Sequence, residues 1–583
     1  MSLLQPRKTS SGVRRKYYAL LLIFFLLIPG LGAYLIYSFL YSSTGQRMQN
    51  MATAIYYGYA DWYLYYLTER NQLDIQTLTL YYLAHQNWIT QHPQIGPYDY
   101  IVGKWDNGTI YALSGETGTV VYTSDNIVSL ISNILDNNMS IFVRKGIYDV
   151  NNVIGVHLFK DNITFIGDYP LFRLVKDDGY AEIFRISGNE IVFQNFVLDG
   201  MNQTYNDRAI FIRGNNTRIE NVKIVNIHSV GIGFGANIFN VTIRNCEISQ
   251  GTSPLAWAIG NMGDVYGTKI QNVTIENVKI DCHHGINFDL VNATNIKIIN
   301  CDIKGDYSDG GLGISVAANE TCPMSRLYII GTRVWNFGDQ DVHIEQNFTK
   351  DVFVSNCYFG RTKRFTSFAY GVAVGQGNGD IIIINSVFEG ASWNGIGLHL
   401  RDGAVAILDS LIIRNCNRTG IAVNGDNTTT VVMNNIEIYN VSMESNTYYG
   451  VIAIYTKVQI GTITVKQTTG SSAPLYGIKI NCGNNSVISN GIVYGNYNAI
   501  FVDSSYYVII NSVNANGGWH GTIAFDYSYN CSVTDSILQR HSTYGAIYST
   551  NSDYLLIDGN IFYGTGLNYS LSGSNNVIGD NLG

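Results

Sequence analysis

Five consecutive apolar segments in the middle of the chain, between residues 285 and 401, carry acidic and basic side chains at alternate positions. If these segments are stacked parallel strands, alternate side chains point to one outer surface. A carboxylate, an imidazole and a guanidinium would then supply the acid, base and cation that glycan cleavage or epimerisation requires. The candidate catalytic residues on this surface are Asp289, His343, Glu345, His399 and Arg401. The alternative interpretation is that they are ordinary solvated side chains on the outside of a rod.

Two pairs of acidic residues lie in the loops beside these segments. Asp306 is close to Asp309, and Asp339 is close to Asp341. Carboxylate oxygens are ligands that Ca²⁺ prefers. Calcium is therefore the one cofactor that the sequence suggests, and these four residues are its candidate ligands.

The segments that must position these residues belong to a repeat. Seventeen times along the chain, a short apolar strand is followed by a step residue and then by a small residue. Fourteen of the seventeen step residues are Asn or Asp, at intervals of 21 to 32 residues, as at Asn245, Asn277 and Asn300. A period of this size, with strand signals and glycine in each unit, is typical of a solenoid.

A second strand follows each step and is often introduced by glycine. Aligning these strands on their leading residues predicts two inward columns and two outward columns. The first inward column is Ile286, Leu312, Val342, Val372 and Ile396, and the second is Phe288, Ile314, Ile344, Val374 and Leu398. The first outward column is Asn287, Gly313, His343, Ala373 and Gly397. The second outward column is Asp289, Ser315, Glu345, Gly375 and His399.

Stacked coils of this kind would pair in parallel, so that seventeen coils would make a rod of about 80 Å. Asn suits the step because it tolerates the left-handed conformation and because stacked Asn side chains can form a hydrogen-bonded ladder. The alternatives are an antiparallel sandwich and a propeller, but propeller repeats are longer and have four strands each. The pattern favours an all-β parallel helix.

Residues 126–135 have the spacing of an amphipathic helix, and the strand-like segment 141–148 follows with a Gly-Ile-Tyr ending. Together with the repeated Asn step, this start resembles the right-handed parallel β-helix proteins of the pectin-lyase-like superfamily, over about residues 120–583. The resemblance implies a helix that covers the open end of the core and a polysaccharide as the ligand. The catalytic motifs of polygalacturonase-like enzymes are mostly absent, because the matching stretches include Gly338-Asp339-Gln340 and His399-Leu400-Arg401.

Residues 19–41 form an uncharged, apolar segment that is long enough to span a bilayer. Five basic residues precede it, so the positive-inside rule places the N-terminus in the cytoplasm and the rest of the chain outside the cell. The sequence thus predicts a single-pass protein of the cell membrane, and a cleaved signal peptide is the alternative. With this segment the chain resembles archaeal membrane-anchored surface β-helix proteins from end to end.

The chain divides into five predicted regions. A basic cytoplasmic tail (1–18) precedes the transmembrane signal anchor (19–41). A Tyr-rich helical stalk (42–95) and a β-hairpin region (96–124) follow. The parallel β-helix with its N-terminal capping helix occupies residues 125–583.

Composition narrows the partners. The net charge of −8 and the lack of a long basic run beyond the N-terminal tail exclude nucleic acid as an expected partner. Sixteen Asn-X-Ser/Thr triplets all follow the predicted anchor and suggest a glycoprotein surface. Cys246, Cys301 and Cys357 follow the step on alternate coils and are expected to be buried and unpaired, whereas Cys282 and Cys322 could pair.

Two functions remain open from the sequence. The favoured one is a membrane-anchored extracellular rod that contacts polysaccharide or a cell-surface glycan without catalysis, as an envelope or adhesion protein. The other is a carbohydrate-active enzyme, either a lyase, a hydrolase or an epimerase, with its site around residues 285–401. The oligomeric state is not predicted.

Overall fold

A computed structural model of the chain describes residues 98–175, 181–202, 207–250, 257–261, 267–306, 310–345, 349–361, 370–377, 379–441, 449–466, 475–495, 497–517, 520–540 and 543–582. The predicted tail (1–18), membrane anchor (19–41) and stalk (42–95) lie outside these residues. The described residues all belong to the second of two units, residues 96–583. Over the described ranges, no helix has the length and apolar character needed to cross a bilayer.

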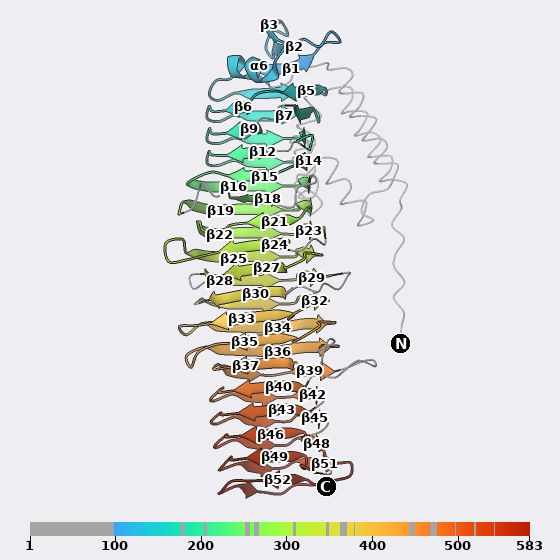
Figure 1. The fold of residues 1–583 in the computed structure, drawn as a ribbon. Helices are drawn as coiled ribbons and strands as arrows, with labels where there is room; N and C mark the ends of the chain where they lie inside the picture. Colours follow the sequence, from blue (N-terminus) through green and yellow to red (C-terminus); the bar gives the residue numbers. More distant parts are fainter. Residues whose placement is uncertain are drawn as a thin grey trace, which may run out of the picture. The chain divides into compact units, whose positions relative to one another are not determined.

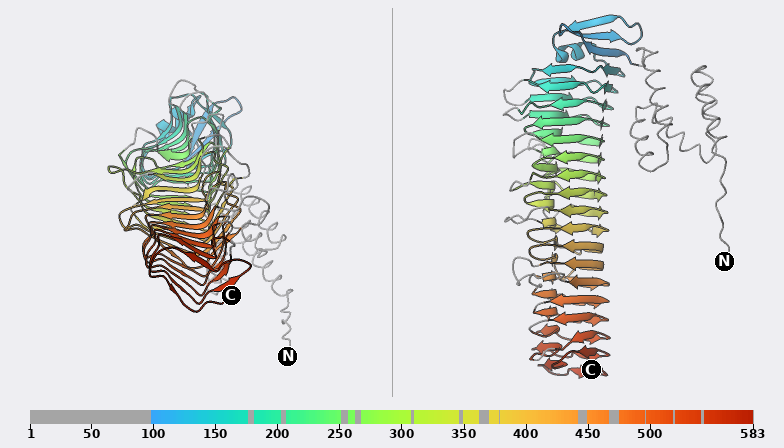
Figure 2. Two further views of the ribbon diagram at one scale, coloured as in Figure 1. Left: turned by 60° about the horizontal axis from the view of Figure 1, so that its bottom comes forward. Right: turned by 90° about the vertical axis from the view of Figure 1, so that its right-hand side faces the viewer.

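The second unit is a parallel β-helix, as the sequence predicts (Figure 1). Each coil contributes a strand to a first ladder, then, after the step residue, a strand to a second ladder, and finally a strand to a separate sheet, here called the front sheet. The front sheet has seventeen described strands, and each pairs in parallel with the strands of the neighbouring coils, the first and last strands with one neighbour each. Figure 2 shows the coils stacked one upon another along the unit.

The front sheet consists of β6 (Ile154–Leu158), β9 (Ala181–Ile186), β12 (Asp207–Ile212), β15 (Val230–Phe234), β18 (Trp257–Asn261), β21 (His284–Asn287), β24 (Leu312–Ala317), β27 (Gln340–Glu345), β30 (Tyr370–Gly377), β33 (Ile396–Leu400), β35 (Ile421–Asn424), β37 (Tyr449–Ile454), β40 (Tyr476–Asn481), β43 (Asn498–Asp503), β46 (Ile523–Asp526), β49 (Ile547–Thr550) and β52 (Tyr569–Leu571).

The first ladder consists of β4 (Ser140–Val143), β7 (Thr164–Gly167), β10 (Val192–Gln194), β13 (Arg218–Glu220), β16 (Ile238–Arg244), β19 (Lys269–Glu276), β22 (Asn292–Ile299), β25 (Met324–Ile330), β28 (Thr349–Ser355), β31 (Ile381–Ile384), β34 (Val405–Arg414), β36 (Thr430–Tyr439), β38 (Lys457–Ile460), β41 (Val487–Ser489), β44 (Ile509–Asn511), β47 (Ser532–Thr534), β50 (Leu556–Asp558) and β53 (Val577–Ile578). Strands β34 and β36 continue into the second ladder.

The other members of the second ladder are β5 (Ile147–Val150), β8 (Leu171–Leu174), β11 (Val197–Asp199), β14 (Lys223–Ile227), β17 (Glu247–Gln250), β20 (Lys279–Asp281), β23 (Asp302–Lys304), β26 (Arg333–Trp335), β29 (Tyr358–Gly360), β32 (Val387–Glu389), β39 (Ile463–Lys466), β42 (Gly491–Gly495), β45 (Asn514–Gly517), β48 (Ile537–Gln539) and β51 (Ile561–Tyr563).

The step between the first and second ladders has the backbone conformation expected for Asn. Asn221, Asn245 and Asn277 have φ values of 53°, 55° and 53°. The Nδ2 of Asn277 donates to Oδ1 of Asn245 at 3.3 Å, and Asn221 bonds Asn195 in the same way at 3.0 Å. Both expectations for the step, left-handed backbone and a ladder along the axis, are confirmed at these positions.

Replacing Asn245 tests the step directly. Asn245→Ala is expected to lower the free energy of unfolding by about 1–2 kcal/mol, because the left-handed conformation disfavours a Cβ and one amide hydrogen bond is lost. Asn245→Gly loses the bond but adopts the conformation freely, so its cost should be smaller. Denaturant unfolding of the two variants measures this order, and a glycine variant less stable than the alanine variant would contradict it.

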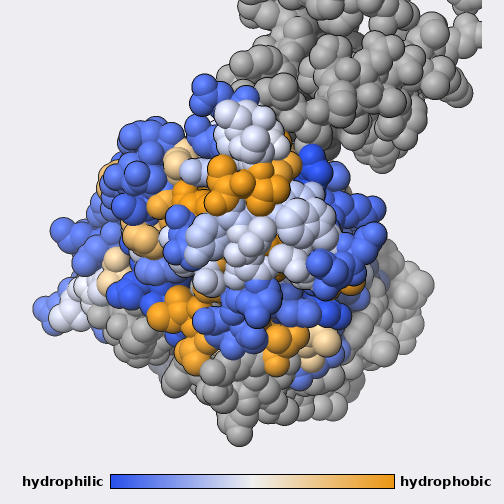
Figure 3. Space-filling view, turned by 90° about the horizontal axis from the view of Figure 1, so that it is seen from above, coloured by the Kyte–Doolittle hydropathy of each residue, from blue (hydrophilic) through white to orange (hydrophobic). Residues whose placement is uncertain are grey.

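The N-terminal end of the unit is covered by a small cap. Strands β1 (Tyr100–Lys104), β2 (Ile110–Ser114) and β3 (Val120–Ser124) pair antiparallel, and β1 also pairs in parallel with β4. Helix α6 (Ile127–Ile134) begins after Asn126, whose Oδ1 accepts from the backbone N–H of Val128 at 2.8 Å. Figure 3, a view onto this end, shows hydrophilic side chains surrounding smaller apolar areas.

The interior of the coils is aliphatic and aromatic, and the cysteines belong to it. All eight cysteines are among the described residues and none forms a disulfide. Cys246, Cys301 and Cys357 are buried, and burial raises the pKa of the Cys246 thiol to about 12. Cys282 and Cys322 are also buried and free, so the pairing that the sequence allowed is not present.

Candidate functional site

The register of the front sheet decides which side chains share its outer surface. Asn287 pairs with Ser315, Ser315 with His343, His343 with Ala373, and Ala373 with Gly397. The predicted column is therefore right except in β24, where Ser315 takes the place predicted for Gly313. Likewise Ile314, not Leu312, pairs with Ile286 and Val342 in the first inward column.

A glycine explains this two-residue error. A Cβ on Gly285 would lie 2.1 Å from the carbonyl oxygen of Gly313, and a Cβ on Gly313 would lie 2.4 Å from that of Asp341. Gly313 is therefore the equivalent of Gly285 at the tight start of the strand, whereas the sequence alignment used Gly311. Ser315 moves from the second outward column to the first as a result.

Asp289 does not stand free on the outer surface. It follows the end of β21, and its Oδ1 accepts from the Ser315 hydroxyl at 2.9 Å and from the backbone N–H of Ala317 at 2.7 Å. These bonds fasten the turn after β21 to β24. The carboxylate thus has a structural role that the sequence did not indicate.

The other candidate catalytic residues lie on different rungs. His343 is half-buried on β27, with Nδ1 2.5 Å from Oε1 of Gln340. Glu345 ends β27 opposite Ala317, and its side chain lies outside the described part of the structure. In the pairing of β30 with β33, the register shifts between Val374 and Gly377.

His399 is exposed on β33, and Arg401 is exposed just beyond the strand. Partial burial and the positive charge of Arg401 lower the pKa of His399. Its imidazole is therefore neutral at neutral pH and can accept a proton. Among the candidate catalytic residues whose side chains the structure describes, His399 and Arg401 are close enough for the charge of one to affect the pKa of the other.

Two of the predicted calcium ligands have basic partners in the structure. Asp306 is exposed, with Oδ1 3.2 Å from Nδ1 of His283, and Asp309 lies outside the described residues. Asp341 is buried, with Oδ1 3.8 Å from Nη2 of Arg361. In the part of the chain that the structure describes, no three His, Cys, Asp or Glu side chains are grouped to hold a metal ion.

A different part of the front sheet carries a set of rings that the sequence analysis did not identify. Tyr449, Tyr476 and Phe501 stack on successive strands, with ring centroids 5.7 and 4.9 Å apart and interplanar angles of 12° and 17°. Next to them, the His520 ring stacks on Tyr497 at 4.5 Å and lies 3.9 Å from Tyr544. We call the half-buried rings of β37 to β49 the aromatic face: Tyr449, Tyr476, Tyr497, Phe501, His520, Tyr544 and Tyr548.

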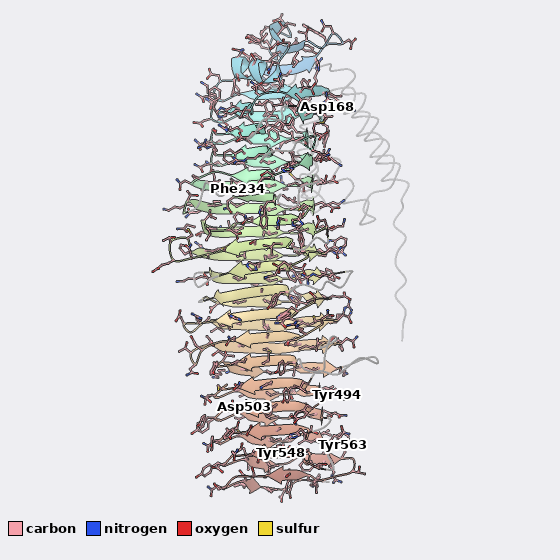
Figure 4. The ribbon with its side chains drawn as sticks, in the orientation of Figure 1. Asp168, Phe234, Tyr494, Asp503, Tyr548 and Tyr563 are labelled. Carbon is pink, nitrogen blue, oxygen red and sulfur yellow. The ribbon has the colours of Figure 1, made fainter. Side chains whose placement is uncertain are left out.

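Polar groups accompany these rings in the adjoining columns. Lys479 on β40 pairs with Phe501 on β43. Its Nζ lies 5.2 to 6.0 Å from the ring centroids of Phe501, Tyr476 and Tyr449. In the next outward column, Asn481 pairs with Asp503, and Asp503 with Asp526. Figure 4 labels Asp503 and Tyr548, which lie on this part of the sheet.

This arrangement has the chemistry of a sugar-binding surface. The stacked rings form a continuous apolar strip, against which the C–H groups of a sugar ring can pack. Carboxylates, an amide and an ammonium can exchange hydrogen bonds with hydroxyl groups. The signal in the sequence is a shared Tyr-Gly start at Tyr449 and Tyr476, which would have been found by continuing the alignment of front strands beyond residue 401.

No family model and no curated protein matches the chain. Among solved structures, the chain is similar to the surface adhesin PfbA of Streptococcus pneumoniae, with 13% identity and a TM-score of 0.34. The similarity covers 69% of this chain and 85% of the adhesin chain. The chain is also similar to the A-module of the mannuronan C-5 epimerase AlgE6 of Azotobacter vinelandii (11% identity, TM-score 0.31; 70% of this chain and 90% of that chain). A third is the pectate lyase Pel9A (11% identity, TM-score 0.28; 59% and 71%). These likenesses are distant, and the architecture of this chain rests on its own strand register.

Proposed function

We propose that this protein is a membrane-anchored extracellular rod that binds polysaccharide through the aromatic face. The observation that carries the proposal is the stacking of Tyr449, Tyr476 and Phe501 on three successive strands. Lys479, Asn481, Asp503 and Asp526 lie on the same strands or the next one. Single exposed aromatic side chains are common on proteins, but a contiguous row of them marks an interaction site more often.

The length of the aromatic face fits a polymer better than a small molecule. It runs over five strands from β37 to β49, which spans about 20 Å at the usual spacing between paired strands. Small ligands are normally enclosed in concave pockets. A row along the axis can instead contact several consecutive sugar units of one chain.

The remaining features of the proposal come from the sequence. The uncharged segment 19–41 after five basic residues supports a membrane anchor with a cytoplasmic N-terminus, and the Asn-X-Ser/Thr triplets beyond it support a glycosylated extracellular part. The right-handed sense predicted for the coils is retained, because crossover connections between parallel strands are almost always right-handed. Calcium remains a proposed cofactor of the acidic loops at residues 306–309 and 339–341.

A non-catalytic role is favoured over an enzymatic one. The carboxylate of Asp289 is committed to Ser315 and Ala317, and that of Asp341 is buried against Arg361. A general base needs to reach a substrate proton, which these contacts hinder. His399 with Arg401 is the part of the predicted catalytic set that an enzymatic function would have to use.

Removal of two rings tests the proposed function. The purified full-length chain in detergent is expected to bind at least one member of a broad polysaccharide panel, and Tyr476→Ala/Tyr548→Ala should weaken that binding by about tenfold or more. Each ring contributes roughly 0.5–1.5 kcal/mol beyond its buried area, and 1.4 kcal/mol corresponds to tenfold. Isothermal titration calorimetry measures the dissociation constants.

The matched control is Tyr328→Ala. Tyr328 is also half-buried and lies 6.3 Å from the ring of Phe353, but on the first ladder. Its loss should leave binding unchanged. An equal loss in the control and the double variant, or no binding to any polysaccharide, would refute the proposed function.

A further inference from the structure

Exposed tyrosines occupy the corner between the front sheet and the first ladder in the C-terminal coils. Tyr455 and Tyr527 follow front strands directly, with φ values of 56° and 45°, and Tyr507 and Tyr554 have φ values of 59° and 58°. Each of the four is at least half exposed, between 50% and 56%. A positive φ costs a residue with a Cβ roughly 1–2 kcal/mol.

The backbone does not require tyrosine at these positions. The neighbouring coils place Ser504 and Asn551, and Asn485 and Asn530, in the same conformation. Asn holds it at less cost, as at the other steps of the coils. Strain that is kept where a cheaper residue is available points to a role for the rings.

Two carboxylates lie at the strand ends just before this corner. Asp503 and Asp526 are in register on adjacent strands, and Tyr527 follows Asp526. The rings of Tyr506 and Tyr529, from the same two coils, stack at 5.3 Å with an interplanar angle of 19°. On the strand side, Phe501 and Tyr548 occupy the neighbouring outward column. Along each of these two coils, the aspartate thus follows the outward column that contains Phe501 and Tyr548 and precedes the tyrosines of the corner.

The charge of this pair is incompletely compensated. Asp503 accepts from the Ser504 hydroxyl at 2.9 Å, whereas Oδ1 of Asp526 is buried without a hydrogen-bond partner. Partial burial and the nearby Asp503 raise the pKa of Asp526, which shows that a second negative charge is unfavourable there. A bound cation would relieve this repulsion and provide the missing donor.

We propose that Asp503 and Asp526, with Tyr527 of the corner and the stacked pair Tyr506 and Tyr529, bind the protonated amino group of an amino-sugar polysaccharide. This inference rests on the proposed function and specifies its ligand class. Carboxylates form charge-assisted hydrogen bonds with an ammonium group, and aromatic faces attract the same charge. A uronate chain would place its carboxylates against the acidic pair and be repelled.

The experiment compares three oligomers of equal length with the full-length protein. They are a glucosamine oligomer, its fully N-acetylated counterpart, which has no positive charge, and a galacturonate oligomer. The glucosamine oligomer should bind about tenfold more tightly than the N-acetylated one, and the galacturonate oligomer more weakly than both. Raising the salt concentration should reduce this preference.

The variant Asp503→Asn/Asp526→Asn should lose the preference for the free amine, so that its dissociation constants for the glucosamine and the N-acetylated oligomers agree within about twofold. Asp380→Asn, an exposed carboxylate in a loop before β31, is the matched control and should keep the preference. Equal binding of the two oligomers by the wild type overturns the inference without any variant, as does a preference that survives in the double variant. In either case the proposed function stands if the tyrosine substitutions in the aromatic face still weaken glycan binding.

Discussion

Arg361→Met is expected to lower the free energy of unfolding by about 3–5 kcal/mol at pH 8, because it leaves the carboxylate of Asp341 buried without its cation. The Arg361 side chain is fully buried, with Nη2 3.8 Å from Oδ1 of Asp341. Its Nε donates to the carbonyl of Phe337 at 2.8 Å, and Nη2 donates to the carbonyls of Asp339 and Tyr370. One guanidinium therefore joins two coils at the start of β27 and β30.

The pKa of Asp341 determines how the stability loss caused by this substitution depends on pH. Burial raises the pKa of Asp341 to about 7, and Arg361 opposes that rise. Between the ordinary carboxyl value of about 4 and pH 7, the folded chain holds this proton more firmly than the unfolded chain does. The contribution of Asp341 to stability therefore falls as pH rises through that window. Without Arg361 the carboxyl stays protonated to higher pH, so the variant should lose less at pH 5 than at pH 8.

Urea unfolding of the variant at both pH values measures the difference. The double variant Asp341→Asn/Arg361→Met removes the charge as well as its partner and should recover part of the loss at pH 8. Equal losses at pH 5 and pH 8, or a double variant as unstable as the single one, would show that the ion pair does not govern stability here.

Phe184→Ala is expected to cost about 3–5 kcal/mol, the usual range for deleting a buried phenylalanine. Phe184 on β9 is fully buried at the centre of a group of rings, with centroid distances of 4.7 Å to Phe193 and 4.9 Å to Phe172. Two more rings, Phe165 and Phe196, lie within 5.9 Å. The cavity would open between coils that cannot close it without moving their strands.

Hydrogen exchange of the N-terminal coils, together with denaturant unfolding, checks this value. Phe239→Ala is the control, because Phe239 on β16 is 44% exposed and should cost less than about 1 kcal/mol. A similar loss for both substitutions would mean that the group of rings around Phe184 is not tightly packed.

The architecture could be predicted from local sequence because the same physical constraint recurs in every coil. Asn245 and Asn277 mark the same corner, and the strands before them pair in step, Val241 with Val273. The error in β24 arose where two glycines, Gly311 and Gly313, offered alternative starting points. A register error of two residues in one coil leaves every side chain on its predicted side of the strand, inside or outside. It does move a side chain from one outward column to the other.

The candidate site was less predictable because its contacts join coils. The burial of Asp341 depends on Arg361, twenty positions further along the chain, and the bonds of Asp289 depend on the register of β24. The aromatic face lies beyond residue 401, where the predicted outward columns end. Neither local propensity nor alternation identifies which outward residues on neighbouring coils meet.

The Asn-X-Ser/Thr triplets have a structural explanation as well. Asn162 bonds Asn138 at 2.9 Å and Asn240 bonds Asn216 at 2.7 Å, and Asn138, Asn162 and Asn240 begin such triplets. These residues have positive φ. Their side chains form a row of hydrogen-bonded Asn residues near the start of the first-ladder strands. A Thr or Ser two positions later falls on an outward strand position, so the fold itself generates the triplet.

The strictly neighbour-to-neighbour pairing of the front sheet has an evolutionary consequence. Deletion or duplication of one entire coil would shorten or lengthen the β-helix by a single strand spacing, about 4.8 Å. All side chains of the remaining coils would keep their inward or outward orientation. Loss of a single amino acid within a strand would instead reverse the facing of the residues on one side of it. The length of the β-helix can therefore change by whole coils while the binding surface stays intact.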